Sequence, residues 1–168
     1  MLPFKDFISE DLVQTGDELY FAFGHNTNIG AFEKLDPPAK LLGRASADGY
    51  RYVLEQYSDI RLDKDSTIEG VLWSLPKDRE SPVNKYEQYY HKKYLTVNFK
   101  GNQYRAFAYK MDSKHYNKKN PSKEYIDVVK KGYEENHIPL KQLDSAVKER
   151  MSRDWYYFLS LIVCSASE

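Results

Sequence analysis

The chain has little of what marks secreted or nucleic-acid-binding proteins. Cys164 is the one cysteine among 168 residues, so no disulfide can form within the chain, and a reducing compartment is expected. Basic and acidic residues number 25 each, which gives a formal net charge of zero. Because holding a polyphosphate backbone requires an excess of positive charge, we expect no nucleic-acid partner.

Long apolar runs are also missing. The most apolar segment, residues 155–164, spans ten residues, whereas a membrane-spanning helix needs about 20, so no membrane partner is expected. The first residues show no basic stretch followed by an apolar run, which argues against a signal peptide and favours a cytoplasmic location. With no repeat and no Pro/Gly-rich linker, residues 1–168 read as a single domain.

The sequence is nevertheless rich enough in apolar residues, at 41%, to build a core that contains several strands. An aromatic run at 19–23 is typical of a buried strand that ends at Gly24. A second strand is predicted at 50–54 after an Asp48-Gly49 turn, and a third, with an internal glycine that indicates a bulge or close backbone approach, at 68–75. The clearest hairpin joins 94–99 to 104–109.

Helices are predicted at three places. The first begins at Ser81-Pro82 and carries Val83, Tyr86 and Tyr90 at helical spacing. A longer helix begins near Asn120-Pro121 and ends before Ile138-Pro139, because proline disfavours helix in the preceding residue. A third covers 141–151. Strands followed by a few late helices, without regular alternation, predict an α+β fold.

The polar turn after Gly24 is the first candidate site. Successive backbone amides around a glycine can bind a carboxylate or a developing oxyanion without a charged side chain. The alternative is a tight turn with a polar rim, since a strand that ends in glycine is common. The turn alone does not decide between them.

Glu87 is the second candidate. In the predicted helix it shares a side with Val83, Tyr86 and Tyr90, where partial desolvation would raise the pKa of its carboxyl towards the range useful for proton transfer. The alternative is a surface glutamate paired with His91 four residues later. No metal-ligand spacing links the four histidines, and no phosphate-binding loop, dinucleotide fingerprint or serine nucleophile motif occurs, so no metal and no cofactor are expected.

Taken in order, these segments resemble the gamma-glutamylcyclotransferase-like (AIG2-like) family over about residues 19–143. The family's strand leading into Tyr-Gly-Ser-Asn-Leu matches a strand that ends in Phe23-Gly24-His25-Asn26-Thr27. Its Gly-Val-x-Trp pattern matches Gly70-Val71-Leu72-Trp73, and its catalytic glutamate matches Glu87. The later matches are a strand tyrosine and a helix with a tyrosine and a glycine, followed by a proline: Tyr94, Tyr125, Gly132 and Pro139.

The resemblance implies a twisted mixed sheet curled into a small barrel with surrounding helices. It also implies a cofactor-free enzyme that converts a γ-glutamyl amine, amino acid or peptide to 5-oxoproline, with Glu87 as general acid and base. The implied substrate-binding residues are Phe23, Gly24, His25, Asn26, Thr27, Tyr94 and Tyr125.

The chain departs from the family pattern at Phe23, His25 and Thr27 in the loop, and at Gln88 after the glutamate, which implies an altered pocket. A non-catalytic binding module on the same fold therefore stays open as an alternative. Residues 1–18 then form an N-terminal extension and 152–168 an aromatic tail. This tail could contact a partner or a second copy in a homodimer, or pack on its own domain.

Overall fold

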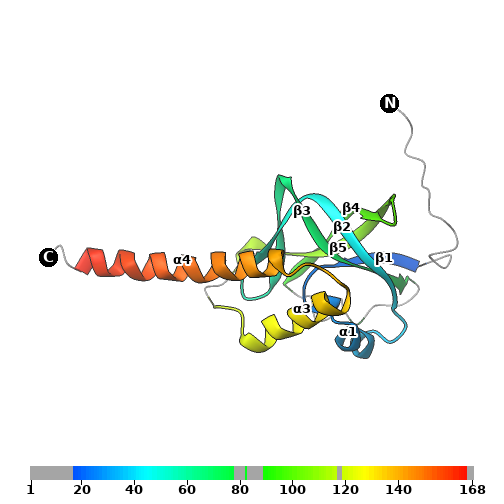
Figure 1. Cartoon of the computed structure of the whole chain (residues 1–168), viewed down its shortest axis with the longest axis horizontal. Helices are drawn as coiled ribbons and strands as arrows, with labels where there is room; N and C mark the ends of the chain where they lie inside the picture. Colours follow the sequence, from blue (N-terminus) through cyan, green and yellow to red (C-terminus); the bar gives the residue numbers. More distant parts are fainter. Residues whose placement is uncertain (1–16, 78–81, 83–88, 117–118, 166–168) are drawn as a thin grey trace.

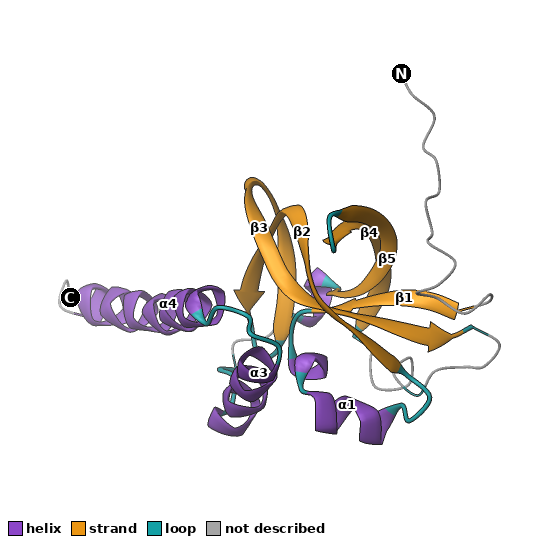
Figure 2. Ribbon diagram, turned by 45° about the vertical axis from the view of Figure 1, so that its right-hand side comes forward, coloured by secondary structure: helices purple, strands orange, loops and turns teal. Residues whose placement is uncertain are grey.

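The computed structural model describes residues 17–77, 82, 89–116 and 119–165, and for 154–165 it gives the course of a helix backbone. Five strands close into a barrel in the order β1-β3-β2-β4-β5 (Figures 1 and 2). The neighbouring strands are antiparallel except β1 and β5, which pair in parallel at Tyr20 and Phe107. This mixed, closed barrel with helices around it confirms the α+β prediction.

The barrel is built from strands that the sequence pattern located only in part. The strands are β1 (Asp17–Ala22), β2 (Lys40–Leu54), β3 (Ser58–Pro76), β4 (Tyr90–Phe99) and β5 (Asn102–Met111). All five predicted strand segments lie within or directly against these elements. β2 and β3, however, extend far beyond the predicted 50–54 and 68–75, because they form one long antiparallel pair whose outer part is not strongly apolar.

Two turn predictions need correction. Asp48-Gly49 is not a turn before a strand but a bulge inside β2, where the register with β3 shifts between Asp48 and Tyr50. Gly49 has φ +82°, which a bulge tolerates and which imitates a turn signal in the sequence. The hairpin connection is also shorter than 100–103: Lys100 and Gly101, with φ 48° and 80°, form a two-residue turn between β4 and β5.

The glycine inside β3 has the role that its position predicts. A Cβ at Gly70 would lie 2.8 Å from the Phe21 ring and still closer to the Ala22 carbonyl oxygen on the neighbouring strand β1. The close approach of the two strands therefore requires glycine here. Three residues on, the indole of Trp73 is fully buried and packs on Phe32, with ring centroids 4.5 Å apart.

The helices are α1 (Ile29–Leu35), α3 (Lys123–Glu135) and α4 (Lys141–Ser165). The helix predicted near Asn120-Pro121 is α3, and its N-cap is Ser122, whose side chain accepts from the Tyr125 backbone N–H. The helix predicted for 141–151 is the start of α4, whose backbone continues to Ser165 and extends away from the barrel (Figures 1 and 2). Short α1 was not predicted. No helix among the described residues is long and apolar enough to span a membrane.

The helix predicted from Ser81-Pro82 cannot be compared over most of its length. Ser81, Val83, Tyr86 and Glu87 lie outside the described residues. Its last predicted residue, Tyr90, opens strand β4 instead, so the helical spacing does not extend that far. His91, the alternative partner of Glu87, is also in β4, and its Nδ1 lies 2.6 Å from the Asp112 carboxylate.

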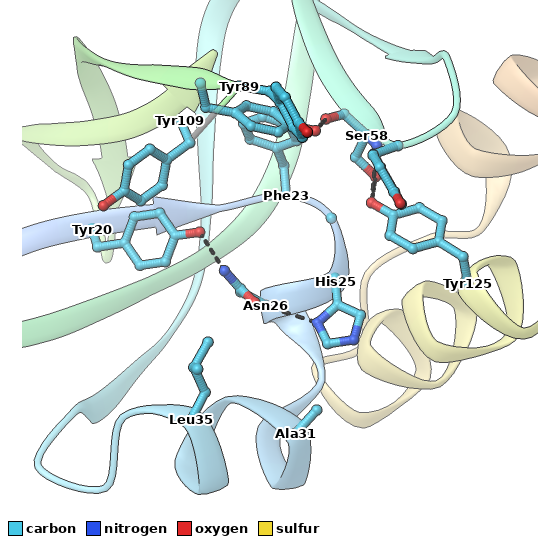
Figure 3. A pocket seen from close by; sticks show the side chains of 13 residues that line it. Tyr20, Phe23, His25, Asn26, Ala31, Leu35, Ser58, Tyr89, Tyr109 and Tyr125 are labelled. Atoms are coloured by element: carbon cyan, nitrogen blue, oxygen red, sulfur yellow. Dashed lines mark hydrogen bonds between the residues drawn. The ribbon is translucent and has the colours of Figure 1, made fainter. Parts of the chain in front are cut away.

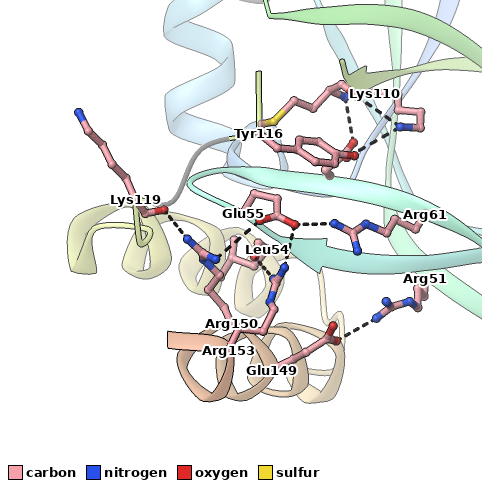
Figure 4. A network of polar contacts seen from close by, with 12 residues as sticks. Arg51, Leu54, Glu55, Arg61, Lys110, Tyr116, Lys119, Glu149, Arg150 and Arg153 are labelled. Carbon is pink, nitrogen blue, oxygen red and sulfur yellow. Dashed lines mark hydrogen bonds and ion pairs between the residues drawn. The ribbon is translucent and has the colours of Figure 1, made fainter. Parts of the chain in front are cut away.

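A charged cluster attaches the middle of α4 to the turn between β2 and β3 (Figure 4). The carboxylate of Glu55, 5% exposed, lies 2.6 Å from Arg61 Nη2 and 3.2 Å from Arg153 Nη1, with Arg150 Nη1 at 3.9 Å. Arg150 also donates to the Lys119 carbonyl at 3.0 Å. The buried Nε atoms of Arg150 and Arg153 find no acceptor among the described residues. Three guanidinium groups therefore depend on one carboxylate.

Candidate active site

A cavity of about 530 Å³ lies at the end of strand β1, between the barrel and helices α1 and α3 (Figure 3). Six of its lining residues are tyrosines: Tyr20, Tyr57, Tyr89, Tyr90, Tyr109 and Tyr125. The others are Phe23, Gly24, His25, Asn26, Ala31, Leu35 and Ser58. Apart from the tyrosines, His25 is the one titratable side chain in this lining, which makes the cavity largely uncharged.

The loop after β1 forms the floor of the cavity because it folds into a single turn of 3₁₀-helix, His25–Thr27. The Thr27 backbone N–H donates to the Gly24 carbonyl at 3.0 Å, and the Thr27 hydroxyl donates to the same oxygen at 2.7 Å. The backbone N–H groups of His25 and Asn26 donate to no described residue. Two amides of the predicted anion cradle are therefore available, whereas the Thr27 amide is used by the loop itself.

Buried contacts hold this loop from behind. The Tyr133 hydroxyl of α3 donates to the Phe23 carbonyl at 2.7 Å, and the Asn136 amide donates to the Thr27 carbonyl at 2.8 Å. From β3, Trp73 Nε1 donates to the Asn26 carbonyl at 3.1 Å. A Cβ at Gly132 would collide with Thr27, so the glycine lets α3 approach. The loop is thus fixed before any ligand arrives.

Ser58 joins three tyrosines at one end of the cavity. Its backbone N–H donates to the Tyr125 hydroxyl oxygen at 2.9 Å, and the Tyr125 O–H donates to Ser58 Oγ at 2.8 Å. Ser58 Oγ also lies 2.6 Å from the Tyr52 hydroxyl, and Tyr90 O–H donates to the Ser58 carbonyl at 3.2 Å. Burial raises the pKa of Tyr52 well above its usual value, so this hydroxyl stays protonated and acts as a hydrogen-bonding group.

The sequence found part of this lining. Phe23, Gly24, His25, Asn26 and Tyr125 line the cavity as predicted from the resemblance, and the His25 ring stacks on Tyr125 with centroids 6.2 Å apart. Thr27 is fully buried behind the loop and is not among the lining residues.

Tyr94 is separated from this group. It lies on β4 at 45% exposure, donates its O–H to Glu18 at 2.5 Å, and has the Arg105 guanidinium 4.0 Å above its ring. A role for Tyr94 in substrate binding therefore finds no support in its position.

Several lining residues could not be identified as site residues from the sequence. Tyr57 lies in the turn between β2 and β3, and Ser58 is the first residue of β3. Ala31 and Leu35 belong to α1, which was not predicted. Tyr20 and Tyr109 were predicted as strand residues. Closure of the barrel brings them together, with ring centroids 5.6 Å apart. Glu87 lies outside the described residues, two positions before Tyr89 in the sequence. Among the described residues, no three His, Cys, Asp or Glu side chains are grouped as metal ligands.

Gly24 is expected to be irreplaceable at the cavity. A Cβ there would lie 2.6 Å from both Cβ and Oγ of Ser58 and 3.3 Å from the Tyr125 hydroxyl oxygen. We predict that Gly24→Ala lowers the free energy of unfolding by about 1–3 kcal/mol in urea titrations, because overpacking forces these groups apart.

Gly30→Ala is the matched control for that substitution. A Cβ at Gly30, in α1, would meet nothing within 4 Å, so this variant is expected to gain up to about 1 kcal/mol from helix propensity. Equal stability of Gly24→Ala and the wild type would contradict the crowding around Ser58.

Comparisons with known proteins agree with this architecture. Residues 67–145 match the AIG2-like family. A solved gamma-glutamyl cyclotransferase superposes with a TM-score of 0.67 at 19% identity, covering 77% of this chain and 86% of that one. An uncharacterized protein from Homo sapiens gives 0.68 at 19% identity over 78% and 86%. YkqA from Bacillus subtilis gives 0.66 at 20% identity over 81% and 55%.

A search of curated protein sequences gives no match. At identities near 20% the structural likeness concerns the fold alone. Together with the family match it confirms the resemblance inferred from the sequence. The chain has the gamma-glutamylcyclotransferase-like fold, and residues 67–145 carry the AIG2-like family pattern.

Proposed function

We propose that this protein is a cofactor-free cyclotransferase that converts a γ-glutamyl amide to 5-oxoproline and a free amine. The observation that carries the proposal is the tyrosine-lined cavity on the Gly24 turn, in the fold of a gamma-glutamyl cyclotransferase. The two available N–H groups of His25 and Asn26 would bind the α-carboxylate of the substrate. The stacked rings of His25 and Tyr125 would pack along one side of the glutamyl chain.

The reaction needs one proton acceptor that later becomes a donor. The α-ammonium loses a proton, and its nitrogen attacks the γ-carbonyl carbon, so that a C–N bond closes a five-membered lactam. The attacking nitrogen gives up a second proton as the lactam forms, the original amide C–N bond breaks, and the leaving nitrogen takes up both protons and departs as an ammonium group. Because nucleophile and electrophile belong to one molecule, binding a folded conformer removes much of the entropic barrier. The reaction therefore needs no second reactant.

We assign the proton transfer to Glu87. The described lining holds no carboxylate, and Glu87 is separated from the lining residue Tyr89 by a single residue. The resemblance found in the sequence supports this assignment, because it matches the family's catalytic glutamate to Glu87. A cytoplasmic location and a homodimer stay predictions from the sequence.

The test is a mass-spectrometric assay for 5-oxoproline after incubating the full chain with γ-glutamyl amines, γ-glutamyl dipeptides and glutathione. We expect catalytic release of 5-oxoproline from at least one of them. Binding of a γ-glutamyl compound without any 5-oxoproline would contradict the enzyme and favour the binding module that the altered loop, with Phe23 and His25, leaves open.

A further inference from the structure

Ser58 carries a buried hydroxyl group at the edge of the cavity. It is the first residue of β3, is 5% exposed and belongs to the cavity lining. Its Oγ has two described hydrogen-bond partners, the hydroxyl of Tyr125 at 2.8 Å (Figure 3) and the hydroxyl of Tyr52 at 2.6 Å. The directions of these two hydrogen bonds decide what the serine can offer to a ligand.

Both tyrosines donate to the serine oxygen. Tyr52 is 6% exposed, and Ser58 Oγ is the described acceptor within reach of its hydroxyl, so the buried Tyr52 O–H donates there. The Tyr125 O–H donates to the same oxygen, and the Tyr125 oxygen already accepts the Ser58 backbone N–H at 2.9 Å. A serine oxygen accepts two hydrogen bonds, and here both are used. The proton of Ser58 therefore has no described acceptor, and it points into the cavity.

This proton lies beside the Gly24 turn. A Cβ at Gly24 would lie 2.6 Å from Ser58 Oγ, so the hydroxyl is directly against the turn. The same turn presents the backbone N–H groups of His25 and Asn26, which donate to no described residue. Three hydrogen-bond donors without a described acceptor thus border the cavity next to one another. A ligand with a carboxylate and a nearby carbonyl group can use all three.

The surroundings of Ser58 suit a hydrogen-bond donor rather than a nucleophile. A serine attacks a carbonyl carbon when a neighbouring base takes its proton. The described partners of Ser58 Oγ both donate to it, and burial raises the pKa of Tyr52 well above its usual value. Neither tyrosine therefore acts as a base. Two donors to one oxygen also polarise the serine O–H, which strengthens the hydrogen bond that it can donate.

We propose that Ser58 is a catalytic residue whose hydroxyl donates a hydrogen bond to the γ-carbonyl oxygen of the substrate, with Tyr52 and Tyr125 as positioning residues. This inference rests on the proposed function. When the α-nitrogen attacks, the γ-carbonyl oxygen gains negative charge, and it becomes a carbonyl again when the original amide C–N bond breaks. A donor fixed at this oxygen stabilises the charged intermediate more than the bound substrate. Ser58 keeps its proton throughout.

The first measurement compares kcat and KM for 5-oxoproline formation by the full chain and by Ser58→Ala, with the best substrate of the γ-glutamyl panel. We expect kcat to fall by about 100-fold to 1,000-fold, the range for one lost oxyanion donor. KM should change little, because this hydrogen bond becomes strong only in the transition state. An unchanged kcat overturns the inference, and so does a rise in KM that accounts for the whole loss of kcat/KM.

Ser74→Ala is the matched control for the loss of a buried serine hydroxyl. Ser74 lies on the same strand, is 1% exposed and donates to Asp17, but it is not among the lining residues. Its kcat should equal that of the wild type, and urea titrations of both serine variants compare their stabilities. A fall in kcat as large as in Ser58→Ala would show a general effect of lost packing and would overturn the inference.

Tyr52→Phe tests the positioning role and leaves Ser58 in place. The ring is retained, but one donor to Ser58 Oγ is lost, so kcat should fall by about threefold to tenfold, as for one neutral hydrogen bond. In the double variant with Ser58→Ala, the Tyr52→Phe substitution should cause no further fall, because Tyr52 acts through Ser58. Fully additive effects of the two substitutions on kcat would overturn the positioning role.

Failure of the inference and failure of the proposed function give different results. If the wild type releases no 5-oxoproline from any γ-glutamyl compound, the cyclotransferase proposal fails. Calorimetric titration with 5-oxoproline, which carries both a carbonyl and a carboxylate, then tests the Ser58 hydroxyl by itself. Binding to Ser58→Ala that is about threefold to tenfold weaker than to the wild type would support a donor to the ligand carbonyl. Equal binding, or no binding to the wild type, overturns it.

Discussion

Glu87→Gln is expected to lower kcat for 5-oxoproline formation by about 100-fold to 10,000-fold, the range typical of lost general acid–base catalysis. Glutamine keeps the size and hydrogen-bonding capacity of the side chain but can neither accept the ammonium proton nor return it. KM should change little, because the cavity holds the glutamyl group through other residues. The rate is measured by mass spectrometry at saturating substrate, beside circular dichroism spectra of both proteins.

His25→Asn is the control for this assignment. His25 is the one titratable side chain other than tyrosine in the described lining, so it is the competing proton acceptor. It is exposed and stacks on Tyr125, and we assign it a binding role. His25→Asn should therefore raise KM more than it lowers kcat. The opposite pattern, with kcat lost in His25→Asn and retained in Glu87→Gln, would transfer the proton-transfer role to His25.

Glu55→Gln is expected to lower the free energy of unfolding by about 3 kcal/mol, because removing one partner leaves buried charge uncompensated. Arg150 has a side chain only 7% exposed and would lose its anionic neighbour, while Arg61 and Arg153 would repel it and each other (Figure 4). Glutamine retains nearly the same volume, so the loss reports charge rather than a cavity. Urea titration followed by circular dichroism measures it.

Glu149→Gln provides the comparison for a surface ion pair. Glu149 lies on the same helix, α4, and pairs with Arg51 at 2.9 Å, but its side chain is 43% exposed. Such a pair contributes at most about 1 kcal/mol. Equal losses in the two variants would show that the Glu55 cluster behaves as an ordinary surface pair and does not anchor α4.

The local parts of the fold could be predicted because each carries its own signal. The aromatic run ending at Gly24 and the alternation around Lys100-Gly101 each identify a strand or hairpin from neighbouring residues alone. The same holds for α3, whose apolar periodicity lies between Asn120-Pro121 and Ile138-Pro139. The resemblance then ordered these segments into a barrel.

The parts of β2 and β3 beyond the predicted segments 50–54 and 68–75 could not be predicted, because their strand structure depends on pairing with each other rather than on their own residue pattern. In the outer part of β3, residues 61–67 are polar except Leu62, and none of them is buried. These residues become strand because β2 and β3 pair with each other along their whole length, at thirteen positions. The Asp48-Gly49 turn prediction was wrong for a related reason. A glycine with positive φ occurs in bulges as well as in turns, and only the pairing of β2 with β3 shows that Gly49 is in a bulge.

For the site, the sequence by itself determined the Gly24 turn and named Tyr125 as a further residue of the same cavity, and both line it. The role of Glu87 as acid and base stays a prediction from the sequence. Only the tertiary structure decided that Ser58 is hydrogen-bonded to Tyr125, that Tyr94 lies outside the cavity lining, and that Tyr20 and Tyr109 lie side by side in that lining. The physical reason is that the five strands close into a barrel. Residues 89 positions apart become neighbours when β1 pairs with β5, and no local pattern records that contact.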